Sequence, residues 1–428
     1  MGKGHLGRSV SIIGVGYTPF GDVRVSPGIK DFSERELYAM ACIEAMRDAN
    51  ISPQEIDAYY VGMTGPGFYA RCKGAGPMYA EWIGMRHKPT LFHDEGCGTS
   101  GFGLQEAVQA VASGVYDCVI SGAVNINSSQ PLYNRPPHIR TDMDHDTIWE
   151  GISTAVDPAY EKPGVGGIGC LEGLILKYID KYGYTFRDVD EALSVYMIGE
   201  RNQALLNPKA VTVTQTFEEE AKKVGLNSAM EYMLSNKFNP RMGTILRGGF
   251  LGKAVDGASA LIVCATEEAY KYTKKPIEVA GVATDTSLNK NWNTVPFAPD
   301  YEMFKRAYAM AGITDPEKEV EYMGIHDCTG SPVILFSETA GYIPEGQAIN
   351  YLKDNRVTFE GDKPITTSGG RVQLGHAVSP SYAVEVAEAV KQMRGENGPR
   401  QMSKEPKCSV IWGGGTGFQD AVTVLKKL

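Results

Sequence analysis

Hydrophobic and polar positions along the first third of the chain predict alternating strands and helices. The stretch "VSIIGVGYTPFG" is typical of a strand that enters a glycine-rich turn. Ser33 and Glu36 have the spacing of a capping box, and the leucine and alanines that follow recur at helical intervals. A second helical pattern begins after Cys97 and ends at Gly114, just before the short apolar run "DCVISGA". This part of the chain therefore predicts an α/β fold.

The middle of the chain, from about residue 126 to 250, loses this regular pattern. It is rich in Pro, Tyr, Asn and charged residues, with helical stretches such as "DVDEALSVYMIGERNQALL". We interpret the region 126–250 as an inserted loop domain with the character of a lid. The buried-strand pattern then returns with "DGASALIVCATEEAY".

The last third repeats the arrangement of the first. It contains a strand pattern "PIEVAGVATDTS", a turn and helix "HAVSPSYAVEVAEAVKQMRG", and an apolar strand ending in glycines, "CSVIWGGGTG". The sequence thus predicts two similar α/β halves whose loop ends meet at one place. We expect the N-terminal half to cover 1–125, completed by about 251–273, and the C-terminal half to cover 274–428.

Composition excludes several classes of protein. The 428 residues are 43% hydrophobic and 22% charged, no apolar run is long enough to span a bilayer, and the N-terminus lacks the layout of a signal peptide. Eight cysteines without a CxxC motif argue against a disulfide framework or a zinc ribbon, and favour a reducing cytoplasm. The formal net charge of −9 argues against non-specific nucleic-acid binding.

Cys97 stands between two glycines where a polar turn gives way to a helix, in "HDEGCGTSGFGLQEAVQAV". The first amides of a helix are unpaired and its dipole favours negative charge, so a thiolate would be stabilised there. Flanking glycines also let another backbone or a substrate approach closely. The cysteine is therefore a candidate nucleophile; the alternative is a small buried residue in a tight turn.

Two histidine-containing segments could supply acid–base groups. One sets His326, Asp327 and Cys328 together in "YMGIHDCTGSPVIL", and the other sets His376 in the glycine-rich "TTSGGRVQLGHAVSP". A thiol beside a histidine in a loop suits proton transfer. A metal site is disfavoured because nothing nearby in the sequence completes a set of ligands. The structural alternatives are a helix-capping Asp327 beside a buried histidine, and a histidine in an exposed turn.

The C-terminal stretch "IWGGGTGFQDA" places three successive glycines after a strand. Such a turn can direct amide groups toward an oxyanion. A phosphate loop is disfavoured because no GK[ST] follows, and the glycine spacing of "GVGYTPFG" does not match a dinucleotide fingerprint. The sequence therefore argues against NAD as a cofactor.

Taken in this order, the four segments resemble the thiolase superfamily over essentially the whole chain. The family's nucleophilic cysteine opens a helix in a C-x-S-G context, matched here by Cys97, Gly98 or Thr99, Ser100 and Gly101. The family's GHP histidine corresponds to His376, and its CxGGGxG loop to "IWGGGTG", with Ile411 in place of the cysteine. Biosynthetic and degradative thiolases carry NEAF where this chain has "HDCT", which resembles the HDCF motif of sterol-carrier-protein-type thiolases.

The resemblance implies a role for each of these residues in cleaving a 3-oxoacyl-CoA. His376 would activate Cys97, His326 would hold the thioester oxygen of the leaving enolate, and Cys328 would carry the proton. The amides of Cys97 and Gly413 would form the oxyanion hole. Two departures from the family's motifs change the expected shape of the pocket, namely Thr329 for the phenylalanine of HDCF and Ala377 for the proline of GHP.

The resemblance also implies a thiolase fold, with two α/β/α halves in five layers and an inserted loop domain, assembled as a dimer or tetramer. Coenzyme A is the expected substrate, with no tightly bound cofactor and no metal in this chain. Bacterial and archaeal thiolases of this type often work with a small zinc-ribbon and OB-fold protein. We therefore expect a homo-oligomeric core with such a small partner subunit.

The acyl group is the least constrained part of this interpretation. Six tyrosines of the middle region could line a pocket for a bulky or aromatic acyl group or pack between helices: Tyr133, Tyr160, Tyr178, Tyr182, Tyr184 and Tyr196. A similarity to the thiolase of anaerobic toluene breakdown favours benzoylsuccinyl-CoA, which would give benzoyl-CoA and succinyl-CoA. The alternatives are an acetoacetyl-CoA thiolase, a decarboxylating ketoacyl synthase and a non-catalytic thiolase-like scaffold.

Overall fold

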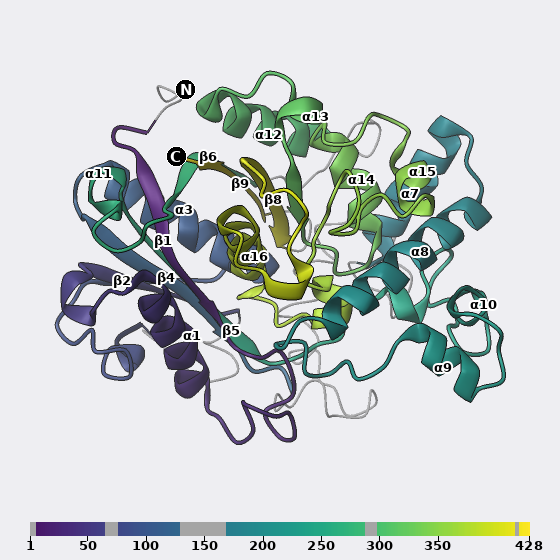
Figure 1. Ribbon diagram of the computed structural model, residues 1–428, viewed down its shortest axis with the longest axis horizontal. Helices are drawn as coiled ribbons and strands as arrows, with labels where there is room; N and C mark the ends of the chain where they lie inside the picture. The colour runs from purple at the N-terminus through teal and green to yellow at the C-terminus, as the bar shows by residue number, and fades with distance from the viewer. Residues whose placement is uncertain (1–5, 65–75, 129–167, 287–297, 416–418) are drawn as a thin grey trace.

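The computed structural model describes residues 6–64, 76–128, 168–286, 298–415 and 419–428 (Figure 1). In these residues nine strands form one sheet, in the order β3-β2-β4-β5-β1-β6-β9-β8-β7. The first five in that order belong to one half: β1 (Val10–Tyr17), β2 (Ala58–Gly62), β3 (Thr90–His93), β4 (Cys118–Asn125) and β5 (Gly257–Ala265). The other half supplies β6 (Ile277–Thr286), β7 (Tyr322–Ile325), β8 (Cys408–Gly415) and β9 (Gln419–Lys427).

The two halves of the sheet have related strand pairings. Strand β2 is parallel to β3 and β4 in the first half, and β7 is parallel to β8 in the second. The remaining pairs within each half are antiparallel. The halves are joined edge to edge by a short antiparallel contact between β1 and β6, at Ser11 with Glu278 and Ile12 with Ile277.

Helices cover both faces of this sheet. Helix α1 (Glu34–Ala49) packs on β1 and β5, and α12 (Ala298–Ala311) packs on β6 and β9. Helices α3 (Thr99–Ala112) and α16 (Ser381–Arg394) contact each other and strands of both halves. Figure 1 shows α16 near the centre, with α1 and α12 on opposite sides. The order helix, half-sheet, central helices, half-sheet, helix gives five layers, which confirms the predicted fold class.

Local sequence signals account for several boundaries of these elements. The capping box of Ser33 and Glu36 is present at the start of α1. Helix α16 ends at Gly395, whose φ of 74° is the left-handed conformation that favours glycine. The shorter helices of the halves are α11 (Thr266–Ala269), α13 (Pro316–Glu319), α14 (Ser331–Thr339) and α15 (Ala348–Lys353).

The middle region supplies helices that pack against the second half. Helix α7 (Ile168–Tyr182) contacts α14, and α8 (Phe186–Leu205) contacts α15. The short helices α9 (Phe217–Lys223) and α10 (Ala229–Leu234) follow. In the described part of the chain, no helix combines the length and apolar character needed to cross a membrane. The exact limits of the two halves and of the inserted region stay a prediction.

The tyrosines of the middle region have differing surroundings. Tyr178 and Tyr184 stack with ring centroids 5.9 Å apart, and Tyr182 packs beside Tyr178 at 4.7 Å. These three rings therefore pack among themselves, as the alternative to a pocket lining predicted. Tyr133 and Tyr160 lie outside the described residues.

Candidate active site

Cys97 lies in a short 3₁₀ turn, Gly96–Gly98, immediately before α3, so the prediction that it opens a helix is confirmed. Gly96 has a φ of +56°, a conformation that glycine adopts without strain. The Thr99 hydroxyl donates to the Gly96 carbonyl at 2.6 Å and accepts from the Glu95 amide at 2.8 Å. Hydrogen bonds on both sides of Cys97 therefore fix the turn.

Polar groups join this turn to the other half of the molecule, and most of them are neutral; the exception is the Glu95 carboxylate, which accepts from the Gln419 side chain. The Ser100 amide donates to the Ser379 carbonyl at 3.2 Å, and the Ala383 amide donates to the Ser100 hydroxyl at 3.0 Å. The Ser379 hydroxyl lies 2.7 Å from the Thr64 hydroxyl and donates to the side-chain carbonyl of Asn125 at 2.5 Å. The start of α3 is thus attached directly to the segment that follows His376.

The segment His326–Cys328 begins where β7 ends, on the strand next to β8. The His326 amide donates to the Trp412 carbonyl at 3.0 Å. The following helix, α14, has Gly330 as its N-cap, and the Asp327 side chain accepts instead from the Arg371 amide at 2.6 Å and from the Tyr196 hydroxyl at 3.1 Å. The alternative of a helix-capping Asp327 is therefore wrong.

His376 follows an unusual turn. Residues Gly370–Leu374 form one turn of π-helix, bounded by Gly369 and Gly375 with φ values of 99° and 118°. The His376 amide donates to the Lys253 carbonyl at 2.9 Å, and its carbonyl accepts from the Val255 amide at 3.2 Å. The glycines around this histidine therefore allow a backbone path that other residues rarely adopt.

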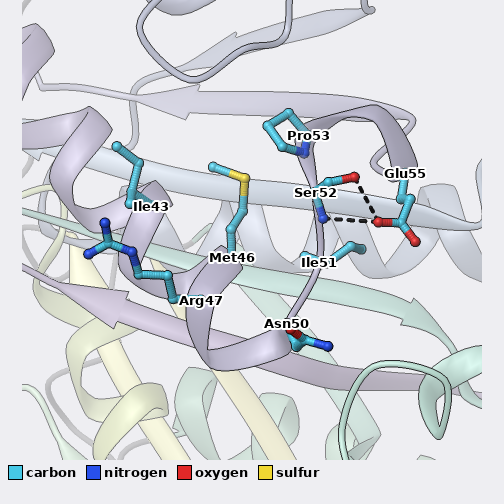
Figure 2. A pocket seen from close by; sticks show the side chains of 8 residues that line it. All are labelled: Ile43, Met46, Arg47, Asn50, Ile51, Ser52, Pro53 and Glu55. Carbon is cyan, nitrogen blue, oxygen red and sulfur yellow. Dashed lines mark hydrogen bonds between the residues drawn. The ribbon is translucent and has the colours of Figure 1, made fainter.

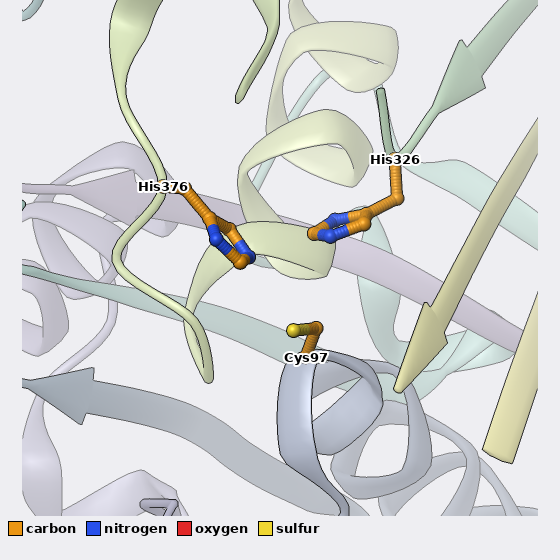
Figure 3. Close-up of side chains that lie close together, drawn as sticks. All are labelled: Cys97, His326 and His376. Carbon is orange, nitrogen blue, oxygen red and sulfur yellow. The ribbon is translucent and has the colours of Figure 1, made fainter. Parts of the chain in front are cut away.

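The structure brings the candidate residues of three segments together (Figure 3). The Cys97 sulfur and one nitrogen of each of His326 and His376 lie within 4.8 Å of one another. The two imidazole centroids are 4.9 Å apart at an interplanar angle of 65°. His326 is buried, whereas Cys97, Cys328 and His376 are partly exposed. A cysteine that a reagent can reach thus faces two imidazole rings.

Burial and neighbouring charges set the protonation of this group. Burial, then His376 and the Arg371 guanidinium, lower the pKa of His326 well below its usual value. Burial, then Arg371, lowers the pKa of His376 to about 3. Burial, then the neighbouring Cys97 and Asp327, raises the pKa of the Cys328 thiol well above its usual value. Near neutral pH both imidazoles are therefore uncharged proton acceptors, and Cys328 is a protonated thiol.

Gly413 also lies beside this group. A Cβ atom added to Gly413 would be 2.5 Å from the Tyr382 ring and 3.5 Å from the Cβ of His326. Ile411, the residue that replaces the family's second cysteine, is fully buried in the core, and so is Ala377. Thr329 is also buried and its hydroxyl lies 2.8 Å from the Ser331 hydroxyl. The last residues of the glycine motif, 416–418, lie outside the described residues.

The sequence interpretation missed a cluster of buried charged residues behind this group. Arg371 is fully buried and donates to Glu385 of α16, which also accepts from Ser368 at 2.8 Å. Glu200 of α8 is buried nearby and accepts from Gln203 at 2.9 Å. The one available signal was an arginine inside the glycine-rich stretch "SGGRVQLGHA". Charged side chains this deeply buried are rare unless they are paired.

The same three side chains could also hold a metal ion. Cys97, His326 and His376 are a group of metal-ligating types with ligand atoms close to one another. The sequence prediction against a metal site considered only ligands close to His326 in the chain. It did not consider Cys97 and His376, which the fold brings next to His326 from remote segments.

A surface pocket elsewhere involves none of these residues. It lies at the C-terminal end of α1, on the outer side of the first half-sheet (Figure 2). Within it the Ser52 amide and hydroxyl donate to the Glu55 carboxylate at 3.0 and 2.7 Å. Its remaining lining residues are Ile43, Met46, Arg47, Asn50, Ile51 and Pro53.

Comparison with known families agrees with the fold and with this arrangement. Residues 10–163 match the family "Thiolase, N-terminal domain", and residues 281–427 match "Thiolase C-terminal domain-like". The chain belongs to the thiolase superfamily. It is an acyltransferase of this class, since the relatives it matches over almost its whole length are named as acetyltransferases and thiolases.

Individual relatives are distant but cover the chain almost completely. Acetyl-CoA acetyltransferase of Methanothermobacter thermautotrophicus is 25% identical, over 98% of this chain and 100% of that protein. Benzoylsuccinyl-CoA thiolase subunit BbsB of Thauera aromatica is 27% identical, over 96% of both chains. Human sterol carrier protein 2 is 25% identical, over 97% of this chain and 71% of that protein.

Solved structures share the fold. The "Ltp2-ChsH2(DUF35) aldolase" superposes with a TM-score of 0.75 at 19% identity, covering 99% of this chain and 98% of that one. Human mitochondrial 3-ketoacyl-CoA thiolase superposes with a TM-score of 0.65 at 15% identity, covering 99% of this chain and 100% of that one.

Proposed function

We propose that this protein cleaves a 3-oxoacyl-CoA with CoA, or catalyses the reverse condensation, through an acyl group carried on Cys97. The observation that carries the proposal is the convergence of the Cys97 sulfur with His326 and His376, within 4.8 Å. The two imidazoles are neutral and the Cys328 thiol is protonated, so a base and an acid are available at the same pH.

In the cleavage direction, His376 accepts the thiol proton of Cys97 as the sulfur attacks the 3-keto carbon. A carbon–sulfur bond forms, and the keto oxygen becomes an oxyanion near the amides of Cys97 and Gly413. The bond between C2 and C3 then breaks, and its electron pair passes to the departing acyl-CoA as an enolate. His326 holds the enolate oxygen, and Cys328 gives its proton to C2. CoA then attacks the Cys97 thioester, its carbon–sulfur bond to Cys97 breaks, and the second acyl-CoA is released. The proton lost by the CoA thiol restores Cys328, and His376 returns its proton to the Cys97 sulfur.

For the acyl group we favour benzoylsuccinyl-CoA, and acetoacetyl-CoA is the alternative. The relative named benzoylsuccinyl-CoA thiolase subunit supports the first, and two archaeal relatives named acetyl-CoA acetyltransferase support the second. Three tyrosines that could have lined an aromatic pocket pack against one another instead. A panel of 3-oxoacyl-CoA thioesters with acyl groups of increasing size discriminates between the two.

For the assembly we propose a homo-oligomeric core with a small zinc-ribbon and OB-fold subunit. Support comes from the BbsB relative, which is named as a subunit, and from the structural neighbour Ltp2-ChsH2(DUF35) aldolase, whose name has two components. Co-expression with a small zinc-ribbon and OB-fold protein of this kind should yield a complex that contains zinc and is more active than the isolated chain. Full activity of the isolated chain would contradict this part.

Trapping the intermediate tests the central proposal. The protein is incubated with a 3-oxoacyl-CoA in the absence of free CoA, digested, and analysed by mass spectrometry. We expect the acyl mass on the Cys97 peptide and none in Cys97→Ser, which keeps the side-chain size but lacks an acidic thiol. Acylation at a different cysteine would refute the assignment.

A metal-centred reaction would use the same three side chains, so the same preparation serves as its test. We expect activity to survive prolonged treatment of the isolated chain with a chelator. Loss of activity that added zinc restores to this chain alone would favour the metal function instead.

A further inference from the structure

Three separate segments meet at the backbone of the proposed acid, Cys328. The Gly252 amide donates to the Cys328 carbonyl at 2.7 Å, and the neighbouring Lys253 carbonyl accepts from the His376 amide at 2.9 Å. A Cβ atom on Gly252 would lie 3.2 Å from the Cys328 carbonyl oxygen and 3.4 Å from the Cβ of His376. The backbone segments that carry Cys328 and His376 are therefore in close contact. A small shift of either segment would change the distance between these two side chains.

Asp327 connects the same two backbones through its side chain. One carboxylate oxygen accepts from the Arg371 amide, in the π-helical turn before His376, at 2.6 Å. A Cβ atom on Gly370 would collide with the other oxygen, so the turn closes tightly around this carboxylate. Because Asp327 lies between His326 and Cys328 in the chain, its position sets where both neighbouring side chains begin.

The second oxygen of Asp327 has a partner from the middle region. The Tyr196 hydroxyl, on α8, donates to this oxygen at 3.1 Å, and both side chains are buried. Burial, then the charge of Asp327, raises the pKa of Tyr196 well above its usual value, so the hydroxyl keeps its proton and stays a donor. The other titratable groups of the cluster are Arg371, Glu200 and Glu385. Burial, then Asp327 and Glu385, raises the pKa of Glu200 well above its usual value, and Glu200 also lies within hydrogen-bonding reach of Tyr196.

We propose that Tyr196 is a positioning residue for proton transfer. Through its hydrogen bond to Asp327 it holds Cys328 and His326 at fixed positions relative to His376 and Cys97. This inference rests on the proposed function and adds to it a residue from outside the four catalytic segments. Tyr196 is one of the tyrosines that could have lined an acyl pocket, and its hydroxyl is directed at Asp327 instead.

The positioning role makes the two chemical steps respond differently. Exchange of CoA into an acyl-CoA requires only the acylation of Cys97 and its reversal, and no carbon is protonated. Cleavage of a 3-oxoacyl-CoA requires Cys328 to reach the enolate carbon, where a small displacement is costly. Loss of the Tyr196 hydroxyl should therefore slow cleavage much more than exchange.

The test compares Tyr196→Phe with Tyr178→Phe in the purified protein, using the acyl-CoA panel for cleavage and labelled CoA for exchange. Tyr178 is a matched control because it is a buried tyrosine of α7 that donates to a carboxylate, that of Glu338, at 2.5 Å. We expect Tyr196→Phe to lower kcat for cleavage roughly ten- to a hundredfold, the range for losing a hydrogen bond to a charged group. Its KM and exchange rate should change by less than about threefold, and Tyr178→Phe should leave both rates near the wild-type values.

Three further results decide the inference. If Tyr196→Phe leaves the ratio of cleavage to exchange unchanged, or lowers both rates together with the melting temperature, Tyr196 only stabilises the fold and the inference is wrong. Asp327→Asn keeps the shape of the carboxylate and should shift the same ratio further. If the wild-type protein shows neither cleavage nor exchange, the proposed function itself fails, and this outcome is distinct from an unchanged ratio.

Discussion

The nucleophile and the acid–base groups are held in place by different kinds of contact. Around Cys97 the buried contacts are neutral: hydroxyls of Thr64, Thr99 and Ser379, an amide side chain, and backbone groups. The carboxylates of Asp94 and Glu95, next to Cys97 in the chain, are exposed or partly exposed. Around His326, Cys328 and His376 they are ionic and deeply buried, with Asp327, Arg371 and Glu385 among them. Two halves with the same succession of strands and helices therefore support their reactive groups in physically different ways.

The difference follows from what each side has to do. The start of a helix such as α3 favours a negative charge, so a thiolate on Cys97 would need no buried cation beside it. The imidazoles, by contrast, must be neutral in the resting protein if they are to accept protons during the reaction. Burial lowers the pKa of both His326 and His376, and the buried Arg371 guanidinium lowers it further. Paired buried charges also fix geometry strictly, because leaving any one unpaired is costly.

The largest effect should come from removing the acid on the ionic side. Cys328→Ala should slow carbon–carbon cleavage by roughly a hundred- to ten-thousandfold, the range typical of losing a positioned acid. Exchange of CoA through the Cys97 thioester should be spared, since this step protonates no carbon. Both rates and a thermal melt are measured on the same preparation, so that unfolding is not mistaken for lost chemistry.

Cleavage at the wild-type rate in a folded Cys328→Ala protein would remove Cys328 from the mechanism. The acid would then have to be sought elsewhere, with His326 next. A parallel loss of both steps and of melting temperature would show that Cys328 is a packing residue.

The next largest effect concerns the buried ion pair itself. Arg371→Met preserves the length of the side chain but leaves the Glu385 carboxylate, also buried, without its cation. We expect the free energy of unfolding, measured by urea titration, to fall by about 3–5 kcal/mol. Burial raises the pKa of Glu385 to about 7, so the carboxylate can take up a proton, and the loss should be smaller at pH 6 than at pH 8.

The double variant Arg371→Met, Glu385→Gln is the control for this explanation. It removes the uncompensated charge, so it should recover part of the lost stability and should lose most of the pH dependence that Glu385 contributes to Arg371→Met. No recovery of stability would mean that Arg371 stabilises the fold by packing. The ion pair with Glu385 would then not distinguish this side of the site from the neutral side around Cys97.

Sequence patterns predicted local features better than contacts between remote segments. The turn at Cys97, the capping box of α1 and the glycine that ends α16 are local features, and the structure has each of them. The bond between Tyr196 and Asp327 joins positions 131 residues apart, and the one from Arg371 to Asp327 spans 44. No local pattern encodes such pairs, and Glu385 has in the sequence the appearance of an ordinary polar position on a helix. The π-helical turn before His376 likewise encloses a carboxylate from a remote segment, that of Asp327.

A third effect follows from the neutral histidines and should appear as pH-dependent stability. His376 has a pKa of about 3 in the folded protein and an ordinary value near 6.5 when unfolded. Between these values the unfolded chain binds a proton that the folded protein does not, so folding becomes less favourable as the pH falls below about 6.5. The contribution is up to about 1.4 kcal/mol per pH unit.

Comparing the wild type with His376→Asn isolates this contribution, because asparagine does not titrate. The wild type should lose stability relative to the variant as the pH is lowered from 6.5 to 5, and their difference should be constant from pH 7 to 8. A difference that does not change with pH would mean that His376 is not held neutral by its surroundings.

The smallest effect is expected on the neutral side, around Cys97. It tests whether the contacts there contribute less to stability than the buried charges do. Ser379→Ala removes the hydroxyl that donates to Asn125 at 2.5 Å and lies 2.7 Å from the Thr64 hydroxyl. Asn125 still accepts from the Thr64 amide at 3.2 Å, and the Ser379 carbonyl still accepts from the Ser100 amide, so no buried carbonyl is left unpaired. We therefore expect a loss of about 1 kcal/mol in the free energy of unfolding, independent of pH between 6 and 8.

In Ser379→Ala the rates of exchange and cleavage should fall together by no more than a few fold, because this contact supports Cys97, which both steps use. A loss as large as that of Arg371→Met would show that hydroxyls fix the nucleophile as strictly as charges fix the acid and base.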